Sequence, residues 1–228
     1  MIAILAPLVP KAATPPSSAA PVAKAAADPA ATTLASVQAY YAHAKQLTTK
    51  FEQTVTTAAF GNAQKSSGTV YLVSPDKMRW DYAAKKPGGA RKSFIFDGKT
   101  LWAVEPKNLQ VFESSATGNM LPAALSFAAG AARITKELDV NLAPNSPYGA
   151  TVLELVPKQP SAQYKRLYFV VAGDGHVEKS IVIDANDNTN EITFQSHDVA
   201  TKLDSKLFQF DPMSVPTFKV IDTDATKP

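Results

Sequence analysis

Apolar residues change their spacing once along the chain, near residue 50. The first regular set follows steps of three and four and consists of Leu34, Val37, Tyr41, Ala44 and Leu47. Such steps place side chains on one face of an amphipathic helix, which we predict from residue 34 to about residue 49. From Lys50 the spacing stays close to two for most of the remaining chain, which is typical of β-strands.

The predicted strands are short and separated by turn signals. They cover residues 50–57, 68–74, 77–83, 92–97, 100–105, 109–114, 139–143, 150–157, 166–172, 177–184 and 190–199. Turn-forming pairs and triplets such as Asp97-Gly98 and Gly173-Asp174-Gly175 lie between them. Connections this short predict antiparallel neighbours, and a sheet of about eleven strands is wide enough to curl strongly.

One stretch interrupts the strands. From Met120 to about Leu138, apolar residues alternate with Ala and Gly at helical spacing. We predict one or two short helices here, inserted into the sheet. The fold class is therefore mainly β with α, namely a strongly curved antiparallel sheet with a leading helix and an inserted helix.

The clearest alternation lies in residues 77–82, where Lys, Arg and Asp alternate with Met78, Trp80 and Tyr82. Several other strands also place large apolar groups on one face, so the aromatic side is expected to face inward. An ordinary packed core accounts for this pattern as well. A sheet this wide, however, encloses more volume than two short helices fill, which favours a hydrophobic bowl under a movable lid.

Composition restricts the class of protein. The 228 residues, 45% of them hydrophobic, are enough for one sizeable core, and we assign residues 34–222 to a single domain. Residues 1–33 are rich in Pro and Ala, and we expect them to be disordered or processed. They fit either a shortened secretory signal or a linker. We expect residues 223–228 to form a tail. A formal charge of +3 argues against nucleic acid, and the absence of cysteine excludes disulfides and thiolate chemistry.

Signals for catalysis are missing. The histidines His43, His176 and His197 lie far apart in the sequence without the spacing of a metal site. Residues 184–188 begin like a calcium loop, but Thr189 stands where Gly is needed. No nucleophile elbow, dinucleotide fingerprint or P-loop occurs. We therefore predict a binding protein with no catalytic residue, metal or cofactor.

Several motifs resemble, in their order, the LolA family of outer-membrane lipoprotein carriers. They are Phe51-Glu52-Gln53, Gly68-Thr69-Val70-Tyr71-Leu72, Pro75 followed by Met78-Arg79-Trp80, Asp97-Gly98-Lys99-Thr100-Leu101-Trp102, and Ala116-Thr117-Gly118-Asn119. The similarity covers about residues 34–215 and is strongest from residue 50 to residue 125.

The resemblance implies an open half-barrel with helices as a lid and a cavity for acyl chains. It implies a periplasmic chaperone, expected to be a monomer, that takes acylated lipoproteins from an inner-membrane ABC transporter to an outer-membrane receptor. The cavity residues implied are Tyr71, Met78, Trp80, Tyr82, Phe94, Phe96 and Trp102. The lid residues implied are Met120, Leu121, Leu125 and Phe127.

One position departs from the family. Many members carry an Arg directly before the Pro of the second hairpin, where it latches to the lid backbone, and this chain has Ser74 there. A Ser hydroxyl donates one hydrogen bond but lacks the charged fork of a guanidinium group. We expect Ser74 to hold the lid more weakly, or another group to act as the latch.

Three alternatives to the carrier remain open at this point. The same scaffold suits a lipid or lipopeptide sensor or a receptor domain, which binds without shuttling. An enzyme acting on an acyl substrate needs a polar catalytic pair inside the bowl. A structural or adhesive β-protein is expected to have a dry, fully packed interior.

Overall fold

The computed structural model describes residues 28–74, 76–84, 86–115, 131–149, 151–161 and 164–224. It contains the helices α1 (Pro29–His43) and α2 (Ala131–Glu137). The strands are β1 (Gln46–Thr57), β2 (Asn62–Val73), β3 (Lys77–Tyr82), β4 (Ser93–Phe96), β5 (Thr100–Glu105), β6 (Gln110–Ser115), β7 (Leu138–Leu142), β8 (Val152–Pro157), β9 (Arg166–Val171), β10 (Val177–Ile183), β11 (Thr189–Asp198) and β12 (Lys219–Asp222).

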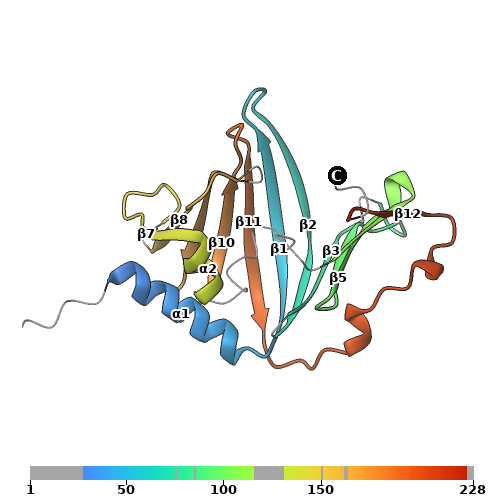
Figure 1. Cartoon of the computed structure of the whole chain (residues 1–228), viewed down its shortest axis with the longest axis horizontal. Coiled ribbons are helices and arrows are strands. Elements are labelled where there is room, and N and C mark those ends of the chain that lie inside the picture. The colour runs from blue at the N-terminus through green and yellow to red at the C-terminus, as the bar shows by residue number, and fades with distance from the viewer. Residues whose placement is uncertain are drawn as a thin grey trace, which may run out of the picture.

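All twelve strands form one open sheet in the order β12-β6-β5-β4-β3-β2-β1-β11-β10-β9-β8-β7. Figure 1 shows it as a curved wall whose edges, β7 and β12, lie at opposite sides of the view. The predicted mainly β, open and strongly curved sheet is confirmed, and each of the eleven predicted strands is present.

Strand β12 was not predicted, and it pairs with β6 in parallel, against the expectation of antiparallel neighbours throughout. Its four residues have no hairpin partner, because a long connection brings them back from β11 across the sheet (Figure 1). Parallel strands need a long crossover connection between them, and no local turn motif predicts such a connection.

The first helix begins and ends earlier than predicted. It starts at Pro29, where the side chain of Asp28 accepts a hydrogen bond of 3.0 Å from the backbone N–H of Ala30 and caps the helix. It ends at His43, and residues 46–49 belong to β1, where Leu47 pairs with Leu72. The backbone pairing of β1 with the whole of β2 places Leu47 in a strand, although its spacing from Ala44 is helical.

The two faces of the sheet are covered differently. We call the face on which α1 and α2 lie the inner face (Figure 1). There Leu34, Val37 and Ile134 of the helices join apolar residues of nearly every strand in one buried cluster. The described helices pack mainly against each other and against β7 and β8. They therefore cover the β7 side of the inner face rather than the β2–β5 side.

The opposite, outer face carries two separate covers. Near β8–β10 the buried residues Val152, Val170 and Ile181 pack beneath the loop that holds Tyr148. Near β3–β5 the segment between β11 and β12 crosses the sheet. It is tied there by a hydrogen bond of 3.1 Å from Arg79 Nη1 to the carbonyl of Leu207. The long C-terminal connection is thus part of the outer face.

The inserted segment lies only partly within the described residues. Its last turns form α2, and Leu138 begins β7 rather than ending a helix. The predicted lid residues Met120, Leu121, Leu125 and Phe127 lie outside the described residues. Among the residues that are described, no helix combines the length and apolar character needed to cross a membrane.

Candidate functional site

The strand register brings five of the predicted cavity residues together on the inner face. In β3, Met78, Trp80 and Tyr82 alternate with charged residues that point to the outer face. Trp80 pairs with Phe94 of β4 and Met78 pairs with Phe96, so these four side chains share one face. This is the face that contains the main buried cluster.

The other two predicted cavity residues, Tyr71 and Trp102, lie on the outer face, which corrects the expectation. Tyr71 pairs with Arg79, and Trp102 pairs with Ile95. The ring of Trp102 contacts Phe210 of the C-terminal connection at a centroid distance of 5.5 Å. Neighbouring residues of a strand point to opposite faces of the sheet, so a shift of one residue changes the face. The observed register places the rings of Tyr71 and Trp102 on the face that does not contain Trp80.

Aromatic rings form a continuous group on the inner face around Phe51 of β1. The ring of Phe51 meets Trp80 at 4.7 Å and Tyr82 at 5.2 Å, both edge to face. Trp80 and Tyr82 stack at 6.1 Å with an angle of 15°, and Tyr82 meets Phe94 at 6.3 Å. Edge-to-face and offset pairs of this kind fix ring orientation. We call these four residues the aromatic group.

Gly68 of β2 makes room for the aromatic group. A Cβ atom at this position would lie 2.7 Å from Cε1 of Phe51 and 2.0 Å from the carbonyl oxygen of Asp81. A side chain here would displace the Phe51 ring or the backbone of β3, so the position requires glycine. Sequence reasoning missed Phe51 as a site residue, although the alternation of Phe51 with Glu52 in β1 is a signal for it.

A set of polar residues borders the aromatic group on the side of the β1–β2 hairpin. Gln53, only 8% exposed, donates to Asn190 and accepts from Ser66, both at 2.8 Å. Burial raises the pKa of Tyr82 to about 12, while a hydrogen bond with Gln53 lowers it and Glu105 raises it. Tyr82 therefore stays neutral at physiological pH.

Two buried polar atoms on the inner face have no hydrogen-bond partner within the described part of the chain. They are Nε1 of Trp80, a residue 2% exposed, and Oγ of Ser180, a residue fully buried in β10. A buried donor without a partner is unfavourable by about 1–3 kcal/mol. Trp80 lies in the aromatic group, whereas Ser180 lies across the sheet, next to Phe169 and Ile192.

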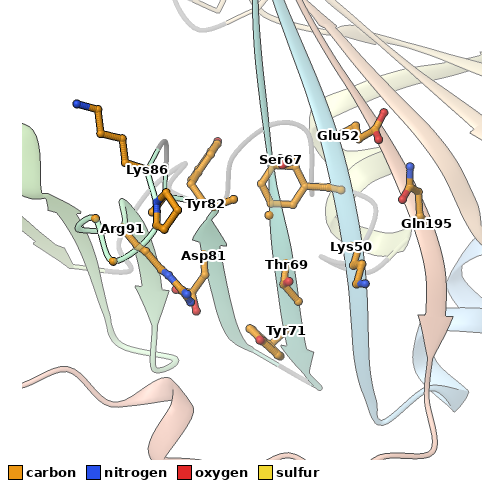
Figure 2. Close-up of a pocket in the computed structure, with 17 residues that line it drawn as sticks. Lys50, Glu52, Ser67, Thr69, Tyr71, Asp81, Tyr82, Lys86, Arg91 and Gln195 are labelled. Carbon is orange, nitrogen blue, oxygen red and sulfur yellow. The ribbon is translucent and has the colours of Figure 1, made fainter.

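A groove of about 880 Å³ is lined by charged and hydroxyl-bearing residues of the outer face together with Phe51 and Tyr82 of the aromatic group. Figure 2 shows Lys50, Thr69 and Tyr71 on the adjacent strands β1 and β2, beside Asp81 and Arg91. The charged part of this wall does not suit acyl chains. Tyr71 thus lines a groove of mixed polar and apolar character.

Ser74 lies at the turn after β2, and Arg79 lies in β3. Ser74 is exposed, and its backbone N–H donates to the carbonyl of Lys45 at 2.9 Å. Arg79 points to the outer face, where Nε contacts a carboxylate oxygen of Asp81 at 2.8 Å. The partner expected for the latch, the lid, lies outside the described residues, so the role of Ser74 stays a prediction.

The fold brings together two histidines that are far apart in the sequence. The rings of His176 and His197 lie 4.5 Å apart, beside Tyr40 of α1 and Asp174. Burial lowers the pKa of His197, as does the charge of His176, whereas Asp174 raises it. In the ranges that the structure covers, no three His, Cys, Asp or Glu side chains are arranged to hold a metal ion.

The open, curved sheet with an aromatic inner face occurs in a known protein family. The family model for the outer membrane lipoprotein carrier protein LolA matches residues 42–211. Since this match spans most of the sequence, the chain belongs to the LolA family.

Individual relatives agree with this assignment. An outer-membrane lipoprotein carrier protein of Chromobacterium violaceum is 36% identical over 98 residues, 42% of this chain and 45% of that protein. The match thus spans less than half of that relative. A protein of the same name from Xanthomonas campestris is 27% identical over 168 residues, 74% of this chain and 78% of that protein.

The fold also recurs in a solved structure. An uncharacterized conserved protein from Thermus thermophilus superposes with a TM-score of 0.50 at 11% sequence identity. The superposition covers 84% of this chain and 98% of that one. At this identity the likeness concerns the fold alone.

Proposed function

We propose that this protein is a periplasmic chaperone that binds the acyl chains of lipoproteins on its inner face. It carries them from the inner to the outer membrane. Membership of the LolA family, whose named members are lipoprotein carriers, is the observation on which the proposal rests. Binding and transport, rather than catalysis, is the activity of such a carrier.

The chemistry of the inner face supports this proposal. Met78, Leu72 and Phe96 lie side by side across β2–β4 and continue the apolar surface beyond the aromatic group. Each methylene group that leaves water for such a surface contributes about 0.8 kcal/mol. Full burial of long acyl chains would exceed a reversible affinity, so incomplete contact and lid opening offset part of this gain.

Loading and delivery require partners of defined kinds. The chain carries no nucleotide-binding motif, so an inner-membrane ABC transporter supplies the energy for loading. An outer-membrane receptor with a more favourable apolar site accepts the cargo. The lid residues Met120, Leu121, Leu125 and Phe127 separate the acyl chains from water in between. Ser74, or another group in its place, holds the lid.

Adjacent residues of β2 on opposite faces provide a matched test. Leu72→Glu places a charge on the inner face, whereas Tyr71→Glu places one on the outer face. Each purified variant is incubated with membrane vesicles that hold a triacylated lipoprotein, and the lipoprotein released in complex with the carrier is measured. Circular dichroism verifies that both variants are folded.

The proposal expects release by the wild type and by Tyr71→Glu, and little release by Leu72→Glu, because a buried charge opposes acyl chains. Equal release by both variants would contradict binding on the inner face. Binding of the lipoprotein without transfer to outer-membrane vesicles would favour a sensor or receptor over a carrier.

A further inference from the structure

The inner face changes from polar to apolar along its strands. Along β2, the residues that face inward are Gln64, Ser66, Gly68, Val70 and Leu72 in chain order. Along β3 they are Tyr82, Trp80 and Met78, which pair with the last three of these. The end near the β1–β2 hairpin is therefore polar, and the opposite end is apolar.

Trp80 lies at the border between the two ends. On its polar side stands Tyr82, which is hydrogen-bonded to Gln53. On its apolar side stand Met78 and Phe96. Its indole Nε1 is the one polar atom of the side chain, and it is buried without a partner among the described residues. This N–H group is covered in the structure, and its hydrogen-bonding capacity is unused, so a ligand acceptor that displaces the covering groups gains a hydrogen bond there.

We infer that Trp80 Nε1 donates a hydrogen bond to the carbonyl oxygen of an acyl ester in the bound lipid. The inference rests on the proposed function and adds the orientation of the cargo. The ester end lies at Trp80 near the polar residues, and the chains run towards Met78, Leu72 and Phe96. A hydrocarbon chain alone leaves the indole N–H unpaired, whereas an ester carbonyl satisfies it.

The second unpaired atom, Oγ of Ser180, does not serve this purpose. Ser180 and Trp80 are both buried, at 0% and 2% exposure, so their place on the inner face, and not their exposure, separates the two donors. It pairs with Phe169 and Ile192, residues of the buried cluster that also contains Leu34 and Val37 of α1. Ser180 is thus a matched control, because it is an unpaired buried donor in the half of the inner face that the helices pack against.

Two lipids of equal chain length separate the hydrogen bond from apolar contact. 1,2-Dipalmitoylglycerol carries two ester carbonyls, and 1,2-dihexadecylglycerol carries ether oxygens in their place. Transfer of each radiolabelled lipid from phosphatidylcholine vesicles to the full chain gives its relative affinity. The wild type is compared with Trp80→Phe, with Ser180→Ala, and with a variant that has 3-benzothienylalanine at position 80. The last keeps the bicyclic ring but lacks the N–H group.

The wild type is expected to prefer the ester lipid about tenfold, the change in affinity that one hydrogen bond provides. Both changes at position 80 are expected to abolish this preference, and Ser180→Ala to keep it. Because each protein is its own reference, altered packing in Trp80→Phe affects both lipids equally. The 3-benzothienylalanine variant provides the same test if Trp80→Phe does not fold.

An undiminished preference in the variants at position 80, or none in the wild type, would overturn the inference while the carrier function stands. Loss of the preference in Ser180→Ala would also overturn it, because the carbonyl would then lie at Ser180. Failure of the wild type to take up either lipid would contradict the proposed function itself.

Discussion

Gly68→Ala is expected to destabilise the protein because the aromatic group occupies the space of the missing side chain. The new Cβ atom would lie 2.0 Å from the carbonyl oxygen of Asp81 and 2.7 Å from Phe51 Cε1. Overpacking of a well-packed site is typically unfavourable by about 1–3 kcal/mol, and here the backbone of β3 must move as well. Alanine restricts the unfolded chain more than glycine does, which returns about 0.5–1 kcal/mol. We therefore expect a net loss of roughly 2 kcal/mol in the free energy of unfolding.

Urea unfolding followed by circular dichroism measures this loss. Gly173→Ala is the matched control, because no atom lies within 4 Å of a Cβ built there. Its free energy of unfolding should equal that of the wild type or exceed it by up to about 1 kcal/mol, because the unfolded chain is restricted in the same way and no clash opposes this gain. If Gly68→Ala behaves like this control, the Phe51 ring does not depend on glycine, and the packing described for the aromatic group is incorrect.

Two further predictions concern buried polar groups. Ser180→Ala removes an unpaired buried hydroxyl and should raise the free energy of unfolding by about 1 kcal/mol, measured by urea unfolding; a destabilised variant would indicate a partner for that hydroxyl. Burial lowers the pKa of His197 in the folded protein. The imidazole of His197 therefore binds a proton more readily in the unfolded chain than in the folded one. As the pH falls below the ordinary pKa of histidine, the folded protein becomes less stable. The melting temperature between pH 7.5 and pH 5.5 should fall in the wild type and in the control His43→Gln, and it should fall less in His197→Gln. An equal fall in all three proteins would exclude His197 as the cause.

The sequence predicts the faces of a strand best where alternation is strict. In β3, charged residues separate Met78, Trp80 and Tyr82, so only one arrangement buries the aromatic side. In β5, Leu101, Trp102 and Ala103 are consecutive apolar residues, and both arrangements are compatible with them. The pairing of Trp102 with Ile95 places its ring on the outer face. Register between strands is a long-range property that local spacing does not contain.

Composition and local spacing also fail to predict the two ends of the folded region. Asp28 and Pro29 form a cap and a first helical turn, yet the surrounding Ala-rich and Pro-rich composition indicated disorder. At the other end, β12 is held by pairing with β6, about a hundred residues earlier in the chain. Both cases depend on contacts with distant parts of the sheet.

Contacts within the site were harder to predict than the fold. Phe51, Gly68 and Gln53 lie on β1 and β2, and their role arises from what β3 and β11 place beside them. Strand alternation already predicts an apolar inner face, and the family resemblance adds acyl chains as its ligand. Neither of them supplies the polar border at Gln53 or the unpaired indole N–H of Trp80.

The two tryptophans of the chain allow the central claim to be measured directly, since Trp80 faces inward and Trp102 outward. Brominated acyl chains quench tryptophan fluorescence on contact. Trp102→Phe leaves only Trp80 to report, and Trp80→Phe leaves only Trp102. With a lipoprotein whose acyl chains carry bromine, we predict strong quenching of Trp80 and little quenching of Trp102. Quenching of Trp102 alone, or of neither residue, would contradict acyl-chain binding on the inner face.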